Sequence, residues 1–204
     1  MAIWQDTFHD WAQAWAAVQD LESVVEDAVL TIGTQHAMVW PGPGGSAQSA
    51  QMDSASELIL VTEDPAGATQ FAQSQGLHAG SHQILLCAQT DSLDLVPQLP
   101  PDGNLAAAPM ENYDLVEVAL FDRPVASGRL SLGEDVGVLA LLVVDEQAQE
   151  FVHVFEQAMV AGLGEEAFTH GVDTLYLIAN EEQGERFLSV DGWTKAAEIL
   201  TFTK

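Results

Sequence analysis

The sequence predicts an α/β protein, built on a mixed β-sheet that carries helices on its faces. One reason is that a strand–helix–strand pattern occurs twice, at residues 57–86 and 173–202. A second reason is that three apolar, partly alternating runs lie close together at 115–121, 125–132 and 136–144, a pattern typical of strands with one buried face. The length of 204 residues allows one or two domains with a sizeable core.

The two copies agree in where they place an aromatic residue and a glycine. Each runs from an apolar strand through a polar turn into a short helix, and then into a second apolar strand. Phe71 precedes Gly76 by five residues, and Phe187 precedes Gly192 by the same distance. This agreement indicates two related α/β halves, the first of them incomplete.

The first element that we expect is an amphipathic helix over residues 4–29. No Gly or Pro interrupts this segment, and its apolar side chains recur at steps of three and four residues; they are Trp4, Phe8, Trp11, Trp15, Val18, Leu21, Val25 and Val29. The three tryptophans form one large apolar stripe. We expect the stripe to pack on the protein's own sheet, and the alternative is a face for a homodimer or another partner.

The segments that follow suggest where the chain divides. Residues 29–40 predict a strand, or the helix end running into a strand, and the Pro/Gly/Ser-rich residues 41–51 predict a loop that lacks the order of a phosphate-binding loop. Residues 93–109 hold four of the eight prolines. We therefore expect a partial half with the Trp-rich helix at 1–92, a linker at 93–109 and a complete domain at 110–204.

The second half begins with an antiparallel meander. Polar turns at 122–124 and 133–135 separate its three strands. A helix is predicted over 149–170, and Gly171 suits its C-terminal cap. A strand at 175–178, a short helix at 183–190 and a last strand at 199–202 complete the order, strand–strand–strand–helix–strand–helix–strand.

The charge of the chain limits its partners. Thirty-one acidic residues oppose five basic ones, which gives a formal net charge of −26. No cluster of Lys or Arg is present to neutralise phosphates, so we expect neither nucleic acid nor an anionic membrane surface as a partner. Such a chain attracts a cationic small molecule or a basic partner. The alternative is that the charge only keeps the protein in solution.

Location and thiol chemistry follow from what the sequence lacks. There is no apolar run of about 18 residues, and the N-terminal segment carries acids where a secretory signal carries bases. The expected location is therefore the cytoplasm. Cys87 stands alone and is expected to be a buried, inert thiol. His78 and His82 are expected on the surface, and no metal site is predicted.

From about Leu115 to Lys204, the chain resembles the GNAT superfamily of acyl-CoA-dependent N-acyltransferases. FDRPVASG, from Phe121, resembles the family's second-to-third strand hairpin, and EEAFTHGVDTLYLIA, from Glu165, resembles its cofactor-helix end and fifth strand. ERFLSVDGW, from Glu185, looks like its last helix and turn. The resemblance implies a GNAT-like mixed sheet, acetyl-CoA or another acyl-CoA as donor, and an amine acceptor. With the first copy, the arrangement looks like a tandem or truncated double GNAT protein.

The resemblance also implies a cofactor site. In the family, the fourth and fifth strands part, the fourth-strand backbone bonds the pantetheine arm, and a loop with the motif Q/R-x-x-G-x-G/A binds the diphosphate. Here Gln149 stands at the first motif position, but Val152 and Val154 replace the two glycines and Glu150 adds negative charge. The cofactor-binding residues implied are Leu141, Leu142, Val143, Val144, Gln149, Phe151, Val152, His153 and Val154.

No catalytic residue can be assigned by the same comparison. The family's usual proton donor is a Tyr, but Leu188 holds the matching position and Ala72 holds it in the first copy; neither donates a proton. Glu117 and Glu134, on or beside the meander, are the candidates for a general base. Two functions are therefore expected. One is an N-acetyltransferase for a cationic amine, in which catalysis relies on holding the amine close to the thioester. The other is a non-catalytic GNAT-like binding or assembly protein.

Overall fold

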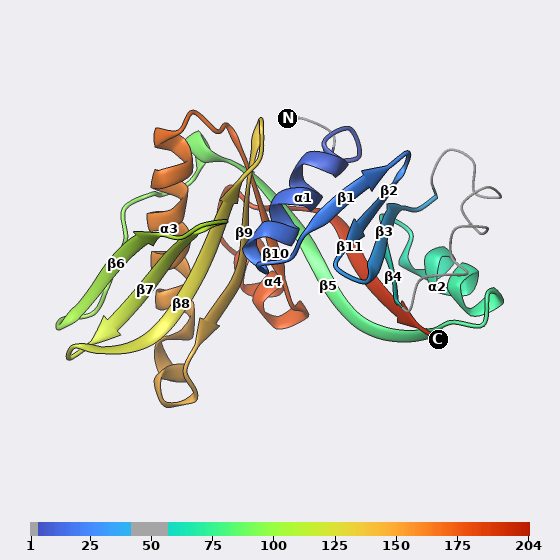
Figure 1. Ribbon diagram of the computed structural model, residues 1–204. Coiled ribbons are helices and arrows are strands. Elements are labelled where there is room, and N and C mark those ends of the chain that lie inside the picture. The colour runs from blue at the N-terminus through green and yellow to red at the C-terminus, as the bar shows by residue number, and fades with distance from the viewer. Residues whose placement is uncertain (1–3, 42–56) are drawn as a thin grey trace.

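The computed structural model describes residues 4–41 and 57–204, and these form one continuous mixed sheet (Figure 1). The eleven strands follow the order β1-β2-β3-β4-β11-β5-β10-β9-β8-β7-β6. β3 runs parallel to β4 and β9 runs parallel to β10, whereas the other neighbours are antiparallel. The α/β class and the mixed sheet with flanking helices are thus confirmed. The loop predicted at 41–51 lies, beyond Pro41, outside the described residues.

The N-terminal helix is shorter than predicted. α1 covers Phe8–Val18, and the chain then forms β1 (Ser23–Glu26), β2 (Val29–Ile32) and β3 (Gln35–Val39). The prediction of a helix over 4–29 is therefore wrong before Phe8, where residues 4–7 form a turn, and after Val18. Asp20 takes a positive φ of 61°, which ends the helix, and the β-branched valines beyond it favour strands. Their three- and four-residue spacing matched a helix only by coincidence.

The tryptophan stripe packs on the sheet, as expected. Trp4, Trp11 and Trp15 are all buried, and Trp11 is completely inaccessible to solvent. They share one core with residues from both sides of the sheet's centre, including Leu30 of β2 and Val138 of β9. α1 therefore ties the two halves together through one face of the sheet (Figure 1).

Both strand–helix–strand copies are present, and they exchange strands. The first copy is β4 (Glu57–Thr62), α2 (Pro65–Ser74) and β5 (His78–Gln89); the second is β10 (Thr174–Ala179), α4 (Glu181–Leu188) and β11 (Thr194–Thr203). β11 pairs with β4, and β5 pairs with β10. β5 and β11 pair with each other at the centre of the sheet. The two halves therefore share a single sheet.

The meander of the second half also forms as predicted. β7 (Asp114–Leu120), β8 (Arg123–Leu132) and β9 (Val136–Val144) pair antiparallel in succession. One further strand, β6 (Gly103–Pro109), pairs with β7 at the sheet edge. It lies inside the segment expected as a linker, and its run of small side chains carries little strand signal.

Helices cover both faces of the sheet. α1 lies on one face, and α2, α3 (Val152–Thr169) and α4 lie on the other (Figure 1). α3 is preceded by a 3-10 helix at Glu146–Phe151 and ends at Thr169, and Gly171 two residues later takes the φ of 80° that the predicted cap requires. Among the described residues, no helix is long and apolar enough to cross a membrane.

Candidate functional site

The two parallel strands at the expected cofactor position separate along their length. β9 and β10 pair from Val136–Thr174 as far as Leu139–Leu177. β9 then continues to Val144 without pairing to β10, while β10 continues to Ala179 with only β5 beside it. The strands therefore open a gap at their carboxyl ends, where the resemblance placed the pantetheine arm.

A β-bulge turns the end of β9 away from β10. Ser127 pairs with Val143 but Arg129 pairs with Ala140, so β9 carries an extra residue here. Leu141 in the bulge has φ of 54°, an uncommon conformation for a branched side chain. Its side chain is 44% exposed and that of Val143 is 55% exposed. Bulges bend a strand and raise its twist, which accounts for the separation.

The gap is bridged by side chains of the protein itself. Gln183 of α4 donates from Nε2 to the carbonyl oxygen of Leu142 at 3.2 Å and to Glu156 Oε1 of α3 at 2.8 Å. Gln183 is 5% exposed and Glu156 is 2% exposed. A β9 carbonyl at the position assigned to the pantetheine arm is therefore already bonded within the chain.

An ion pair completes this network. Arg186 donates to Glu156 through Nε at 2.8 Å and through Nη2 at 2.7 Å. The hydrogen bond to Glu156 raises the pKa of the Arg186 guanidinium. A buried carboxylate requires such partners, because an unpaired charge in the interior is costly. α4 is held in position by its N-cap, since Asn180 Oδ1 accepts a hydrogen bond from the Gln183 N–H.

The expected diphosphate loop is wound into helix. The 3-10 turns run directly into α3, and the Val152 N–H bonds to the Gln149 carbonyl. Gln149 donates from its side chain to the Val144 carbonyl at 3.0 Å. A helix N-terminus binds anions through unpaired N–H groups. Here the helical turns begin at Glu146, directly after Asp145, so acidic residues occupy the anion-binding end.

The other loop residues serve the helix. Phe151 stacks on Phe155 with ring centroids 5.5 Å apart, and His153 contacts Gln157 at 3.2 Å between the two side-chain nitrogens. Val152 and Val154 lie in the first turn of α3. The structure thus brings the predicted residues to one region beside the gap, but in a helical rather than a glycine-loop conformation.

The candidate acids and bases separate along the meander. Glu117 of β7 lies opposite Ser127 of β8, which in turn faces Val143, so Glu117 is near the open end of β9. Glu134 sits in the turn at the other end of β9, where its N–H bonds to Asp10. Leu188 is exposed and Phe187 is buried against Trp193. Of the two predicted bases, only Glu117 is near the gap.

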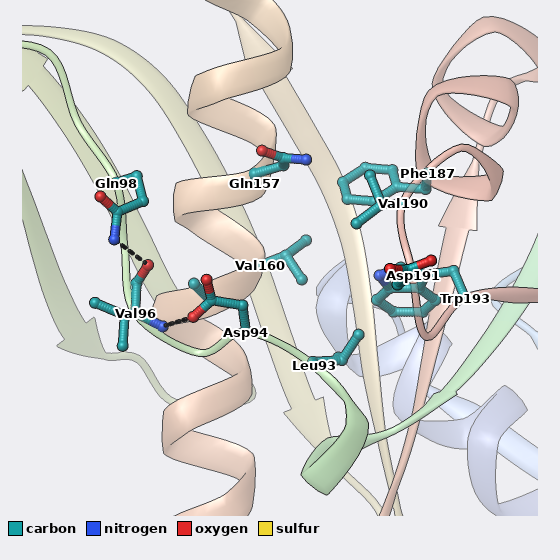
Figure 2. A pocket seen from close by; sticks show the side chains of 11 residues that line it. Leu93, Asp94, Val96, Gln98, Gln157, Val160, Phe187, Val190, Asp191 and Trp193 are labelled. Atoms are coloured by element: carbon teal, nitrogen blue, oxygen red, sulfur yellow. Dashed lines mark hydrogen bonds between the residues drawn. The ribbon is translucent and has the colours of Figure 1, made fainter.

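Two features were missed by sequence reasoning. One is the Gln183–Glu156–Arg186 network, for which the sequence offers only the weak signal of a carboxylate directly after Phe155 on the helix. The other is a cavity of about 190 Å³ between α3, the end of α4 and the segment 93–98 (Figure 2). Trp193 is buried and lines this cavity, and no spacing in the sequence indicated the cavity.

The fold matches solved GNAT structures along most of the chain. A GCN5-related N-acetyltransferase from Kribbella flavida is similar with a TM-score of 0.69 and 16% identity, covering 100% of this chain and 96% of that one. A GCN5-related N-acetyltransferase-like protein from Streptococcus suis 89/1591 gives 0.59 and 10% over 97% and 98%. A tandem GNAT protein from the clavulanic acid biosynthesis pathway gives 0.58 and 13% over 86% and 77%.

These matches define the fold class. The chain has a GNAT fold, as its element order predicted. No family model matches the sequence, and no curated protein sequence matches it either. The likeness therefore lies in the structure, and any chemistry depends on the residues around the gap.

Proposed function

We propose that this chain is an acetyltransferase-like protein that does not hold acyl-CoA in the gap between β9 and β10, and that it acts as a non-catalytic binding or assembly module. One observation carries the proposal. Gln183 bonds the Leu142 carbonyl across the gap, and the Glu156–Arg186 pair fixes it there. The acidic surface favours a cationic partner.

The cost of opening the gap supports this proposal. A pantetheine arm bonded to the Leu142 carbonyl would displace Gln183 and disturb the network around the buried Glu156. Displacing Gln183 would break its hydrogen bond to Glu156 Oε1, and leaving a buried polar group without its hydrogen bond costs about 1–3 kcal/mol. Binding of the diphosphate would offset little of this cost, because Glu146 and Glu150 lie within the helical turns that replace the glycine loop.

The residues available for proton transfer support it as well. The side chain at the usual Tyr position is Leu188, which points away from the core and is exposed. Tyr176 lies on β10 but is fully buried, and its hydroxyl is 3.0 Å from Thr7 Oγ1. Neither supplies a proton to a departing thiolate in the gap.

An acetyl-CoA titration tests the proposal. At a hundred times its Kd a ligand stabilises the native state by about 2.7 kcal/mol, so we expect no rise in Tm and no heat of binding at millimolar acetyl-CoA. The matched variant is V152G/V154G/Q183A, which frees the loop and the Leu142 carbonyl together. It should bind acetyl-CoA where the parent chain does not. Binding by the parent chain would contradict the proposal.

A second function, acyl-CoA-dependent transfer to a cationic amine, is favoured by one observation. β9 and β10 separate at their carboxyl ends, as the resemblance implies for a strand pair that holds acyl-CoA, with Glu117 near the open end. In this reaction a base first removes a proton from the ammonium, and the neutral nitrogen then attacks the thioester carbonyl. The carbon–sulfur bond breaks, the nitrogen loses a second proton, and the thiolate takes up a proton as free CoA leaves. Release of free CoA thiol from acetyl-CoA and a diamine, followed with a thiol reagent, would identify this activity.

We also propose that the two halves are an internal repeat. In each half a strand runs parallel to its neighbour, β3 beside β4 and β9 beside β10, and a strand–helix–strand unit follows. The similarity to a tandem GNAT protein supports this origin. The division at 93–109 then marks the junction of the copies.

A further inference from the structure

The cavity between α3 and α4 has an apolar floor. Phe187 and Trp193 meet edge to face with ring centroids 5.8 Å apart, and Val160, Ala161 and Leu93 complete the apolar lining (Figure 2). Phe187 is buried, as is Trp193. Their contact fixes both rings, so the cavity of about 190 Å³ has a rigid aromatic wall.

Two carboxylates lie among the lining residues. They belong to Asp94, on the segment after β5, and Asp191, in the turn after α4. One oxygen of Asp94 accepts the Val96 N–H at 3.1 Å, which holds the side chain in place while its second oxygen remains free to accept. Among the described residues, none bonds to the Asp191 carboxylate.

Among the described residues that line the cavity, none has a basic side chain that could neutralise these charges. The two bases nearest in sequence are Arg186 and Lys195, and each already pairs with a carboxylate, Arg186 with Glu156 and Lys195 with Glu198. The net charge of −26 adds to the negative potential of the whole surface. An anionic ligand such as a nucleotide is therefore disfavoured here.

We infer that this cavity binds a small organic cation, an alkylammonium with a compact apolar body. The ammonium is attracted by the two carboxylates and by the aromatic faces of Phe187 and Trp193, and the alkyl groups fill the space beside Val160. The inference rests on the proposed function in that it names the site and the chemical class of the cationic partner. It involves neither the gap between β9 and β10 nor any acyl transfer.

Two probes of matched shape test the inference on the full chain. Choline carries a trimethylammonium head, and 3,3-dimethylbutan-1-ol has carbon in place of the charged nitrogen. We expect choline to bind about tenfold more tightly, measured by calorimetry and by the shift of an indole N–H signal in NMR spectra. Choline binding should also weaken as salt is raised. Equal affinities, or no binding by either probe, would overturn the inference.

Variants of the rim carboxylates give the second arm. D94N/D191N keeps the shape of the rim and should weaken choline binding about fivefold. The control is D27N/D102N, which removes two exposed carboxylates at positive φ, where Asn is tolerated. An equal loss of choline affinity in both variants would show that only the net charge of the protein matters, and would reject the site.

The two proposals fail separately. Acetyl-CoA binding by the parent chain would contradict the non-catalytic function and leave the choline result standing. A chain that binds neither acetyl-CoA nor choline would keep the first proposal and remove the second.

Discussion

At the scale of single residues, Glu156 has the most demanding environment in the described chain. Its carboxylate is almost fully buried, and it accepts hydrogen bonds from Gln183 Nε2 and from Nε and Nη2 of Arg186. Such a group either is fully bonded or destabilises the fold. Together the three side chains link α3 and α4 to the Leu142 carbonyl of β9.

Replacing Glu156 by Gln should destabilise the protein by about 2 kcal/mol, because Arg186 would lose its ionic partner. The value is below that of a fully buried pair since the Arg186 side chain is 28% exposed. The measurement is the free energy of unfolding in urea. E166Q serves as control, because Glu166 forms an exposed i,i+4 pair with His170 and its loss should cost less than about 0.5 kcal/mol. Equal losses would show that the network does not hold α3 to α4.

Cys87 predicts how stability responds to alkaline pH. Burial raises the pKa of its thiol from 9.0 to about 11. Between these values the unfolded chain loses a proton that the native state keeps, so stability is complete below pH 9 and falls as pH rises toward 11. Burial also raises the pKa of the Tyr176 hydroxyl, so this group too lowers the stability of the native state as pH rises.

The test compares the parent chain with C87A between pH 8 and pH 10.5. The parent should lose about 1–2 kcal/mol more unfolding free energy over this range than the variant. Urea titrations at each pH measure the difference. Parallel curves for the two proteins would show that the thiol is not shielded in solution.

At the scale of elements, local patterns predicted most of the second half. The strands at 115–121, 125–132 and 136–144 and the cap at Gly171 follow from alternation and glycine placement, and each was found within a residue or two. The helix over 4–29 was wrong because the valines of β1 and β2 fit a helical period as well as a strand. Periodicity alone does not separate the two.

The cofactor-binding role implied for residues 141–154 stays a prediction. The residues 141–154 do lie beside a separation of β9 from β10. The hydrogen bond across this separation comes from Gln183, and Arg186 pairs with Glu156 beside it. Gln183 and Arg186 lie far along the chain from residues 141–154 and meet them only after folding. The cavity is likewise lined by residues that are far apart in the sequence, from the segment 93–98 and from the turn that contains Trp193. Neither contact has a local pattern that would reveal it.

At the scale of the whole molecule, the exchange of strands makes the halves interdependent. β5 of the first half lies between β10 and β11 of the second. The domain division predicted at 93–109 therefore separates segments of sequence that share one sheet.

A fragment of residues 110–204 should fail to fold alone, because its β10 and β11 would have no strand between them. We expect no cooperative transition for it in thermal unfolding followed by circular dichroism. Adding a separate 1–92 fragment should restore the transition, since it returns β5 and β4. A cooperative 110–204 fragment without this addition would show that the second half is an independent domain.

The central position of β11 has a consequence for the order of assembly during synthesis. This strand follows all the others along the chain, yet it fills the space between β4 and β5. Until it emerges from the ribosome, both neighbours keep unpaired edges that could bind another chain. The nascent protein is thus most exposed to aggregation in the interval before β11 emerges, and chaperone contacts should concentrate on β4 and β5 at that stage.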